Sequence, residues 1–309
     1  MTRPSPSGLL VLDKPGGVTS HDVVNRVRRA FGVKRVGHAG TLDPMATGVL
    51  VVCVGEATRA IELLETEPKE YVAGVRFGVS TDTQDMTGRV TSERGSRGLT
   101  RAALEAALEG FRGERMQAPP MVSAVHHEGK RLYELARRGV EVERNARPIV
   151  VHRLEALGFE PGDRASCTLR IVCSAGTYVR TLAHDLGEAL GCGGALTSLR
   201  RIRVGRYGLD RACSPAELED DAFRARALVP LAEALAHLPA VVADDAALDR
   251  LAHGQPLDLV VDWPTGAIGA VLNPQGAVVA VARRVDGRLQ PIKVFAAALE
   301  ASGRSTQAR

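Results

Sequence analysis

The sequence has little cysteine and no long hydrophobic run. Its five cysteines include no C-x-x-C pair, so we expect neither a disulfide framework nor a zinc site, and we predict reduced thiols. The longest apolar runs, such as residues 48–55, are far shorter than the roughly 20 residues of a membrane-spanning helix. The N-terminal segment MTRPSPSG lacks a signal-peptide pattern. We therefore expect a cytoplasmic protein with no membrane partner.

Lysine and aromatic residues are also scarce. Only five of the 40 basic residues are lysines, and aromatics make up 4% of the chain. Arginine suits forked contacts to phosphate and stacking on bases, but an arginine-rich coding bias explains the same composition. Because aromatics are so few, each of the four tyrosines is a candidate for a specific role.

The remaining composition is that of an ordinary globular protein. The 309 residues are 45% hydrophobic and 25% charged, and this length favours two domains. The net charge of +4 is unevenly distributed, with +4 in residues 1–60, +5 in residues 164–212 and −3 in residues 213–309. A surface for a polyanion would therefore lie in the first two-thirds of the chain.

Periodicity predicts an α+β fold with a mixed, mostly antiparallel sheet. Either Thr19 or Ser20 forms a capping-box pattern with Asp22 before a helix that ends near Gly32, and Thr100 precedes a second helix. The polar segment 113–147 is interpreted as an insertion or a mobile loop, and a small β-rich domain follows residue 238. The predicted strands are residues 9–12, 49–54, 71–79, 149–157, 167–173, 258–262, 267–272, 277–284 and 291–295.

The segment 37–48, GHAGTLDPMATG, is the most unusual in the chain. Its glycines permit left-handed backbone or close approach to a ligand, and Pro44 restricts Asp43 to an extended conformation. Asp43 is either a reactive carboxylate held on a rigid loop or a local turn cap. The segment is not a phosphate-binding P-loop, because it lacks the terminal G-K-[ST].

Two further positions could carry chemistry. The segment 174–180, SAGTYVR, leaves a strand and opens a helix, which places Arg180 in a first helical turn with its positive potential. There Arg180 could hold a phosphate or a buried carboxylate, and a structural salt bridge fits equally well. Tyr71, at the start of a strand, is either a core aromatic or a stacking platform.

Four segments together resemble one family. They are LLVLDKPGGVTSHDVV (9–24), GHAGTLDPMATG (37–48), KEYVAGVRFG (69–78) and CSAGTYVRTLAHDLG (173–187). In this order they resemble the bacterial tRNA pseudouridine(55) synthases of the TruB type, over most of residues 8–210. The resemblance implies a pseudouridine synthase catalytic fold over residues 1–238, with residues 113–147 as a thumb-like RNA-binding insertion. Residues 239–309 would form a small PUA-like domain.

The resemblance also implies a chemistry and its residues. The enzyme would isomerise the T-loop uridine at position 55 of tRNA to pseudouridine, without cofactor or metal. Asp43 matches the family's nucleophile, which attacks either C6 of uracil or C1′ of ribose. Arg180 matches the arginine that pairs with this aspartate and keeps it ionised in a desolvated pocket. Tyr71 matches the tyrosine against the target base, where it could help to remove the C5 proton.

Other matched positions would bind the substrate. His38 matches the histidine involved in flipping the uridine out of the loop, and Lys14 would support the wall of the active site. Tyr178 and Leu199 would line the base pocket, and Lys130 and Arg131 lie in the thumb-like insertion, with Arg137 and Arg138. A solvated charged helix is the alternative for that insertion.

The expected partner is the T-arm of tRNA, bound by a monomer that needs no protein partner. Two alternatives remain beside the synthase. One is a tRNA-binding or folding chaperone in which catalysis is secondary, and the other is a related synthase that acts on another RNA. The net-acidic C-terminal domain does not suit an electrostatically driven RNA contact. It would contact the acceptor end through a local patch, or serve as a structural support.

Overall fold

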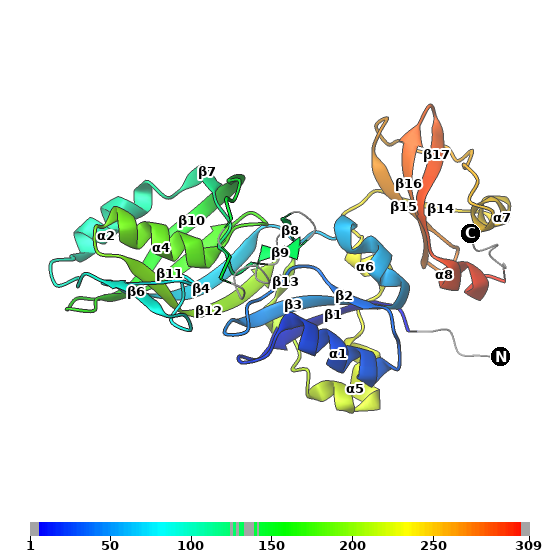
Figure 1. Cartoon of the computed structure of the whole chain (residues 1–309). Helices are drawn as coiled ribbons and strands as arrows, with labels where there is room; N and C mark the ends of the chain where they lie inside the picture. The colour runs from blue at the N-terminus through cyan, green and yellow to red at the C-terminus, as the bar shows by residue number, and fades with distance from the viewer. Residues whose placement is uncertain (1–5, 124–125, 128–129, 133–138, 141, 304–309) are drawn as a thin grey trace.

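The computed structural model describes residues 6–123, 126–127, 130–132, 139–140 and 142–303 (Figure 1). Its main feature is a nine-stranded sheet in the order β1-β3-β12-β4-β11-β10-β7, with β2 paired to β3 and β13 to β12. All of its pairings are antiparallel except the parallel pair of β12 and β3. A separate four-stranded sheet follows in the C-terminal part. The predicted α+β class with a mixed, mostly antiparallel sheet is confirmed.

The strands of the central sheet are β1 (Gly8–Lys14), β2 (Val36–His38), β3 (Thr47–Val54), β4 (Lys69–Phe77), β7 (Gly113–Gln117), β10 (Arg147–Glu160), β11 (Ser166–Cys173), β12 (Gly194–Val204) and β13 (Tyr207–Gly208). The helices around it are α1 (Ser20–Phe31), α2 (Arg101–Glu109), α4 (Val179–Ala189), α5 (Asp221–Ala227) and α6 (Leu231–Ala234), with the 3-10 helices η1 (Gly55–Leu63), η2 (Leu209–Arg211) and η3 (Glu217–Glu219). Two small hairpins join β5 (Val79–Thr81) to β6 (Val90–Glu93) and β8 (His126–His127) to β9 (Lys130–Arg131).

Local sequence signals account for α1. The Thr19 side chain accepts from the Asp22 backbone N–H, and the Asp22 carboxylate accepts from Thr19 N, so both partners of the capping box are present. At the other end Gly32 adopts φ +62°, the left-handed cap that glycine favours. The predicted start and end of this helix are confirmed.

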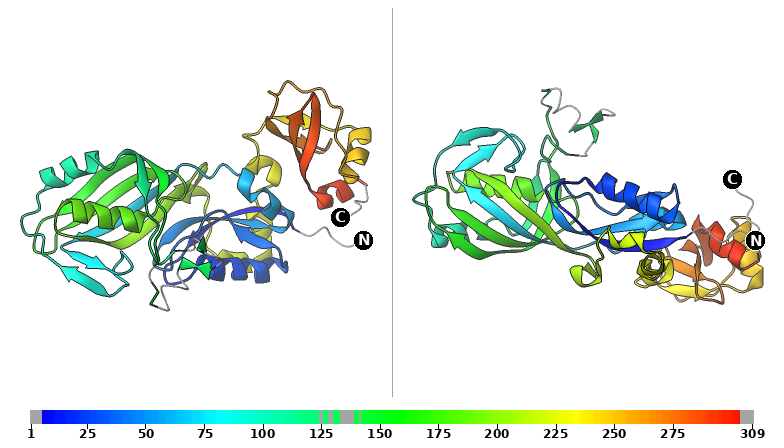
Figure 2. Two further views of the ribbon diagram at one scale, coloured as in Figure 1. Left: turned by 45° about the horizontal axis from the view of Figure 1, so that its top comes forward. Right: turned by 90° about the horizontal axis from the view of Figure 1, so that it is seen from below.

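The core lies between the sheet and the helices on its faces (Figures 1 and 2). Along β4 the side chains of Tyr71, Ala73, Val75 and Phe77 alternate onto one buried face and join one core cluster with apolar residues of α1, α2 and α4. The N-terminus of α4 is thereby fixed against the middle of the sheet, next to β4 and β12.

The C-terminal sheet corrects one predicted strand. Its strands are β14 (Ala240–Val242), β15 (Ile268–Leu272), β16 (Val278–Val285) and β17 (Arg288–Val294), and its helices are α7 (Asp245–Ala252) and α8 (Ala296–Ala301). The predicted strand 258–262 is wrong, because this segment has no strand partner and Val260 is 99% exposed. Instead Asp258 binds Arg250 and Arg288, so side-chain bonds hold the segment as a loop.

The segment 113–147 is only partly an insertion. Its first five residues form β7, which pairs with residues 147–151 of β10 at the edge of the central sheet. Of the residues expected to bind RNA here, Lys130 and Arg131 lie in β9, and nothing is described of their side chains; Arg137 and Arg138 lie outside the described residues. Within the described part of the chain, no helix is long and apolar enough to cross a membrane.

We expect Gly48→Ala to destabilise the fold at the point where β3 meets β12. Gly48 has φ +102°, and a Cβ there would lie 2.1 Å from the carbonyl oxygen of Arg201. Backbone cannot yield as a flexible side chain can, so the free energy of unfolding should fall by about 2–4 kcal/mol in urea titrations. Gly254→Ala is the control: its φ is +67° with nothing within 4 Å, so it should cost only about 1 kcal/mol. Equal losses would contradict the clash.

Candidate active site

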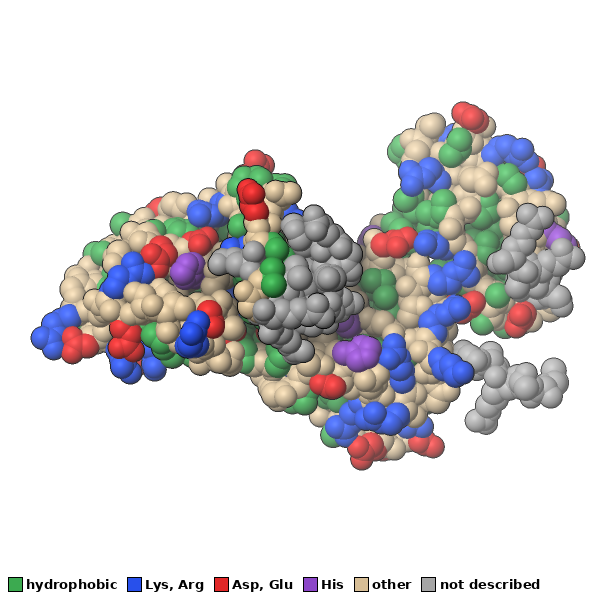
Figure 3. Space-filling view, in the orientation of Figure 1, with side chains coloured by type: hydrophobic (Ala, Val, Ile, Leu, Met, Phe, Trp, Pro, Cys, Tyr) green, Lys and Arg blue, Asp and Glu red, His purple; other side chains and the backbone are tan. Residues whose placement is uncertain are grey.

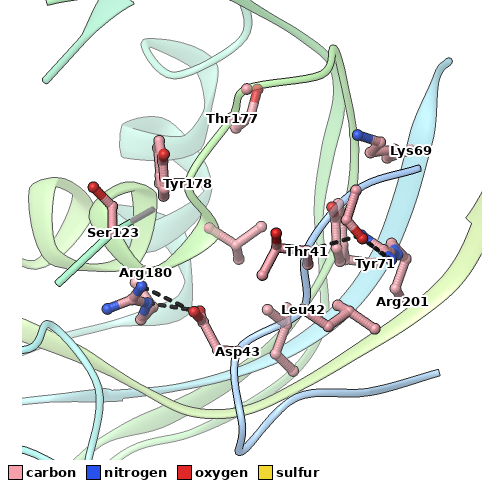
Figure 4. Close-up of a pocket in the computed structure, with 14 residues that line it drawn as sticks. Thr41, Leu42, Asp43, Lys69, Tyr71, Ser123, Thr177, Tyr178, Arg180 and Arg201 are labelled. Atoms are coloured by element: carbon pink, nitrogen blue, oxygen red, sulfur yellow. Dashed lines mark hydrogen bonds and ion pairs between the residues drawn. The ribbon is translucent and has the colours of Figure 1, made fainter. Parts of the chain in front are cut away.

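A cavity of about 250 Å³ opens where the loop after β2, strand β4, strand β12 and the start of α4 converge (Figure 4). Five separate segments of the chain supply its walls. The lining residues are Gly40, Thr41, Leu42, Asp43, Lys69, Tyr71, Ser123, Gly176, Thr177, Tyr178, Val179, Arg180, Leu199 and Arg201. Five of the predicted site residues therefore face one cavity: Asp43, Tyr71, Tyr178, Arg180 and Leu199.

Asp43 and Arg180 form a two-pronged ion pair in this cavity. Arg180 Nε donates to Asp43 Oδ2 at 2.8 Å, and Nη2 donates to Oδ1 at 3.1 Å. The Asp43 side chain is 33% exposed, whereas that of Arg180 is 4% exposed. The carboxylate thus faces the cavity while its partner is buried, an arrangement that holds a charged oxygen in a fixed direction.

The turn that carries Asp43 is set by its backbone. Ala46 N donates to the carbonyl oxygen of Asp43 at 3.1 Å, which closes a turn around Pro44. On the α1 side, Ser20 Oγ and the backbone of Leu42 exchange hydrogen bonds of 3.1 and 2.9 Å. The side chain of Asp43 is free of these turn bonds and turns to Arg180 instead, so the alternative of a mere turn cap is wrong.

Arg180 is also fixed from behind. Its Nη1 donates to the carbonyl oxygen of Thr83 at 3.0 Å, and its Nη2 to that of Val122 at 2.8 Å. A second carboxylate, Asp85, lies with Oδ2 3.9 Å from Arg180 Nε and is itself buried. Sequence reasoning missed Asp85, although the turn-forming run TDTQDMTG at 81–88 marks a loop built around an aspartate.

We expect Asp85→Asn to weaken the site without removing it. Asp85 Oδ1 accepts from Thr83 Oγ1, Thr87 N and Thr87 Oγ1, and Oδ2 faces Arg180. The amide has no charge, and its NH₂ group would face the N–H donors of Arg180. The free energy of unfolding should therefore fall by about 1–3 kcal/mol, and the turnover rate by about tenfold. Asp82→Asn, at an exposed carboxylate in the same hairpin, should change neither measurably. Similar effects of both variants would remove Asp85 from the site.

Tyr71 and Leu199 form apolar walls of the cavity. Strands β4 and β12 pair antiparallel, with Leu199 opposite Ala73 and Arg201 opposite Tyr71. Burial raises the pKa of the Tyr71 phenol, so this ring is neutral near pH 7 and offers a flat apolar face. Tyr178 lies at the start of α4, where its backbone N–H donates to Gln117 Oε1 at 2.7 Å.

Two cations of the cavity wall were not predicted from sequence. Arg201 is fully buried, and it donates to the carbonyl oxygens of Val49 (2.7 Å), Thr41 (3.2 Å) and Gly40 (3.1 Å). Lys69 is half-buried, and burial together with the charge of Arg201 lowers its pKa. Lys69 could have been found, because it stands two residues before Tyr71 and so shares the face of β4 that carries Tyr71.

Lys14 and His38 do not line the cavity. Lys14 is buried under the loop, where Nζ donates to the carbonyl oxygens of Pro15, Val18 and Pro44 at 2.9, 2.6 and 3.3 Å. Desolvation lowers the pKa of Lys14 to about 8. His38 lies in β2 opposite Val52, and burial with the charge of Arg201 lowers its pKa. Lys14 thus supports the loop that presents Asp43, and His38 ends the strand that leads into this loop.

The described residues bring no three His, Cys, Asp or Glu side chains together as a metal site would require. Burial raises the pKa of the thiols of Cys53 and Cys167 to about 12, and of Cys173 to about 11. Thiols with such pKa values stay protonated and are poor nucleophiles. Among the described residues that line the cavity, Asp43 alone carries a carboxylate.

Comparison with known proteins finds two matching family models. Residues 28–179 match the N-terminal domain model of the TruB family pseudouridylate synthases. Residues 180–243 match the model of the tRNA pseudouridylate synthase B C-terminal domain. The cavity residues from Gly40 to Arg201 all fall within these two matches.

Curated relatives match over most of both chains. The tRNA pseudouridine synthase B of Symbiobacterium thermophilum is 53% identical over 247 residues, covering 80% of this chain and 82% of the relative. That of Dehalococcoides mccartyi is 43% identical over 293 residues, covering 93% and 96%. Among solved structures, a chain of a Cbf5-Nop10-Gar1 complex matches with a TM-score of 0.69 and 27% identity over 93% of this chain and 84% of that one.

Proposed function

The chain belongs to the TruB family of pseudouridylate synthases, and from this premise we propose that it isomerises uridine 55 in the T-loop of tRNA to pseudouridine. It is an isomerase that modifies tRNA. The main support for uridine isomerisation is the position of Asp43. Its carboxylate accepts two hydrogen bonds from Arg180 and faces a cavity that Tyr71 also lines.

The reaction changes one bond of the nucleotide for another. The bond between N1 of uracil and C1′ of ribose breaks, the base turns, and C5 of uracil bonds to C1′, while C5 loses a proton and N1 gains one. Asp43 is proposed as the nucleophile. Attack at C1′ of ribose and attack at C6 of uracil are the two possible routes, and each divides one difficult step into two easier ones. Arg180 holds the carboxylate by two hydrogen bonds and aims it into the cavity.

The cavity is suited to a base that has left its stack. An enzyme that acts on a base must extrude it into a pocket, and an aromatic face stabilises the extruded ring by stacking. Tyr71 supplies such a face beside Leu199. We propose that Tyr71 also helps to remove the C5 proton and that His38, at the end of β2, acts in the extrusion.

Basic side chains outside the cavity suit the RNA backbone. Figure 3 shows Lys and Arg side chains gathered over α1 and onward toward the C-terminal domain. Arg29, Lys34, Arg35 and Arg59 are exposed in this part of the chain. The proposal includes phosphate contacts by this surface and by the insertion that holds Lys130 and Arg131.

The C-terminal domain, proposed as residues 239–309 of PUA type, packs on the catalytic domain proposed as residues 1–238. Arg59 Nη1 donates to the carbonyl oxygen of Val294 at 2.7 Å, and Glu56 Oε2 accepts from Ala297 N at 2.9 Å. Lys293 Nζ lies 2.9 Å from Glu62 Oε1. These contacts favour the structural-support alternative for the net-acidic domain.

The test is site mapping of pseudouridine by mass spectrometry in an unmodified tRNA transcript incubated with the pure protein. We expect pseudouridine at position 55 of the tRNA as the single product, formed without added cofactor. We also expect the enzyme to be a monomer. Product at another position would refute the T-loop assignment. Tight tRNA binding without product would favour the chaperone alternative.

A further inference from the structure

Two opposite walls of the cavity differ in whether their charged side chains form an ion pair (Figure 4). On one wall Asp43 and Arg180 neutralise each other at 2.8 Å. On the other wall Lys69 and Arg201 have no ion-pair partner among the residues that the structure describes. This second wall carries uncompensated positive charge inside the protein.

The two cations of this wall lie close together. A Cβ atom added at Gly40 would lie 3.3 Å from Lys69 Nζ and 3.7 Å from Arg201 Nη1. Arg201 is held there by three backbone carbonyl oxygens, so it cannot move away from Lys69. Like charges brought together under partial burial are costly unless an anion joins them.

The neighbouring acidic and thiol groups do not neutralise Lys69. Glu70 points to the opposite face of β4, where Arg170 and Arg203 take its carboxylate. Cys173 pairs with Lys69 across the strands, but its thiol has a pKa raised to about 11 and is uncharged near neutral pH. The charge of Glu67 also acts on Lys69, but Glu67 is exposed and forms no ion pair with Lys69 among the described residues. A counter-charge held close to Lys69 would therefore come from a molecule that enters the cavity.

We propose that Lys69 binds a backbone phosphate of the flipped target nucleotide or its neighbour, and that Arg201 acts behind it as a positioning residue. This inference rests on the proposed function, since it takes the substrate to be RNA. Lys69 and Tyr71 share one face of β4 and are separated by about 7 Å of strand, the scale of one nucleotide. Tyr71 is buried and Lys69 half-buried, so a phosphate at Lys69 would keep more of its hydration than a base at Tyr71.

Protonation offers a second reason for a phosphate. Burial and Arg201 lower the pKa of Lys69 from its ordinary value of 10.5. A bound phosphate favours the ammonium form, so RNA binding and proton uptake by Lys69 support each other. We expect the affinity for RNA to fall as the pH rises through the pKa of Lys69.

The test compares Lys69→Met with Arg164→Met in binding to a T-arm stem-loop transcript. Arg164 is exposed, lies outside the cavity near the end of β11 that is far from Lys69, and controls for the loss of one charge. The binding measurements use the Asp43→Asn background, so that no turnover occurs. For Lys69→Met we expect an affinity loss of about fivefold to tenfold and a slope of log affinity against log salt that is smaller by about 0.7 to 1.

The remaining arms separate the explanations. Lys69→Arg should recover most of the affinity, because it restores the charge. Affinity and salt slope equal to those of Arg164→Met would overturn the inference. The rate constant of Lys69→Met at saturating RNA is measured with Asp43 intact. A lower rate constant with unchanged affinity would also overturn the inference, because the charge of Lys69 would then act on the reacting base. Since binding is measured without turnover, failure of the proposed function appears separately, as absence of pseudouridine with the wild-type chain.

Discussion

Asp43→Asn should abolish pseudouridine formation while leaving tRNA binding within about threefold of the wild type. The amide has nearly the shape of the carboxylate, so the turn around Pro44 and the cavity should persist. It lacks the negative charge and the nucleophilic oxygen, and loss of a nucleophile should lower the rate constant by at least about 1,000-fold. Single-turnover assays that measure product by mass spectrometry, with equilibrium binding in parallel, test this expectation.

Asp13→Asn is the matched control for this variant. Asp13 also takes both prongs of an arginine, with Arg200 Nη2 2.7 Å from Oδ2 and Nη1 3.2 Å from Oδ1. Its side chain is 36% exposed, close to the 33% of Asp43, but it does not line the cavity. The control should lose less than about threefold in rate. Substantial product from Asp43→Asn would disprove the assignment of the nucleophile.

Arg180→Met is expected to give the second largest effect, on activity and on stability together. The substitution leaves Asp43 without its partner and leaves the carbonyl oxygens of Thr83 and Val122 without their donor. Removing one partner of a largely buried pair should cost about 3 kcal/mol of unfolding free energy, near the lower end of the usual range because Asp43 is partly exposed. The rate constant should fall by at least about 100-fold, since the carboxylate is no longer aimed.

A conservative variant separates the two effects. Arg180→Lys keeps the charge and should keep most of the stability, but one ammonium cannot make both bonds to Asp43 as well as those to the two carbonyls. Its rate constant should therefore remain at least about tenfold below that of the wild type. Arg200→Met is the control for loss of a forked pair outside the cavity. Full activity of Arg180→Lys would show that charge alone is needed at this position.

Part of the catalytic domain follows from local sequence. The capping box of Thr19 and Asp22, the left-handed Gly32 and the alternation along β4 each act within a few residues, so their effects can be read from the chain. The loop around Asp43 is also local, since its glycines and Pro44 limit the backbone directly. The resemblance of four segments to one family then joined Asp43, Tyr71 and Arg180 in a single site, where the structure places them.

Other features depend on which distant segments meet. The segment 258–262 alternates like a strand, yet Asp258 binds Arg250 and Arg288, and the place beside β15 is taken by β14. Asp85 reaches Arg180 only because the β5–β6 hairpin folds back against the start of α4. No spacing within the sequence encodes these meetings.

The sequence by itself determined the family, the glycine-rich loop that carries Asp43, and the match of Asp43 to the nucleophile of that family. The tertiary structure decided how that carboxylate is aimed and what faces it across the cavity. Strand β12 lies between β3 and β4, so Arg201, far along the chain, meets Gly40 and Lys69 there. The physical reason is that backbone preferences act over a few residues, whereas the position of a buried charge is set by the order of strands in the sheet.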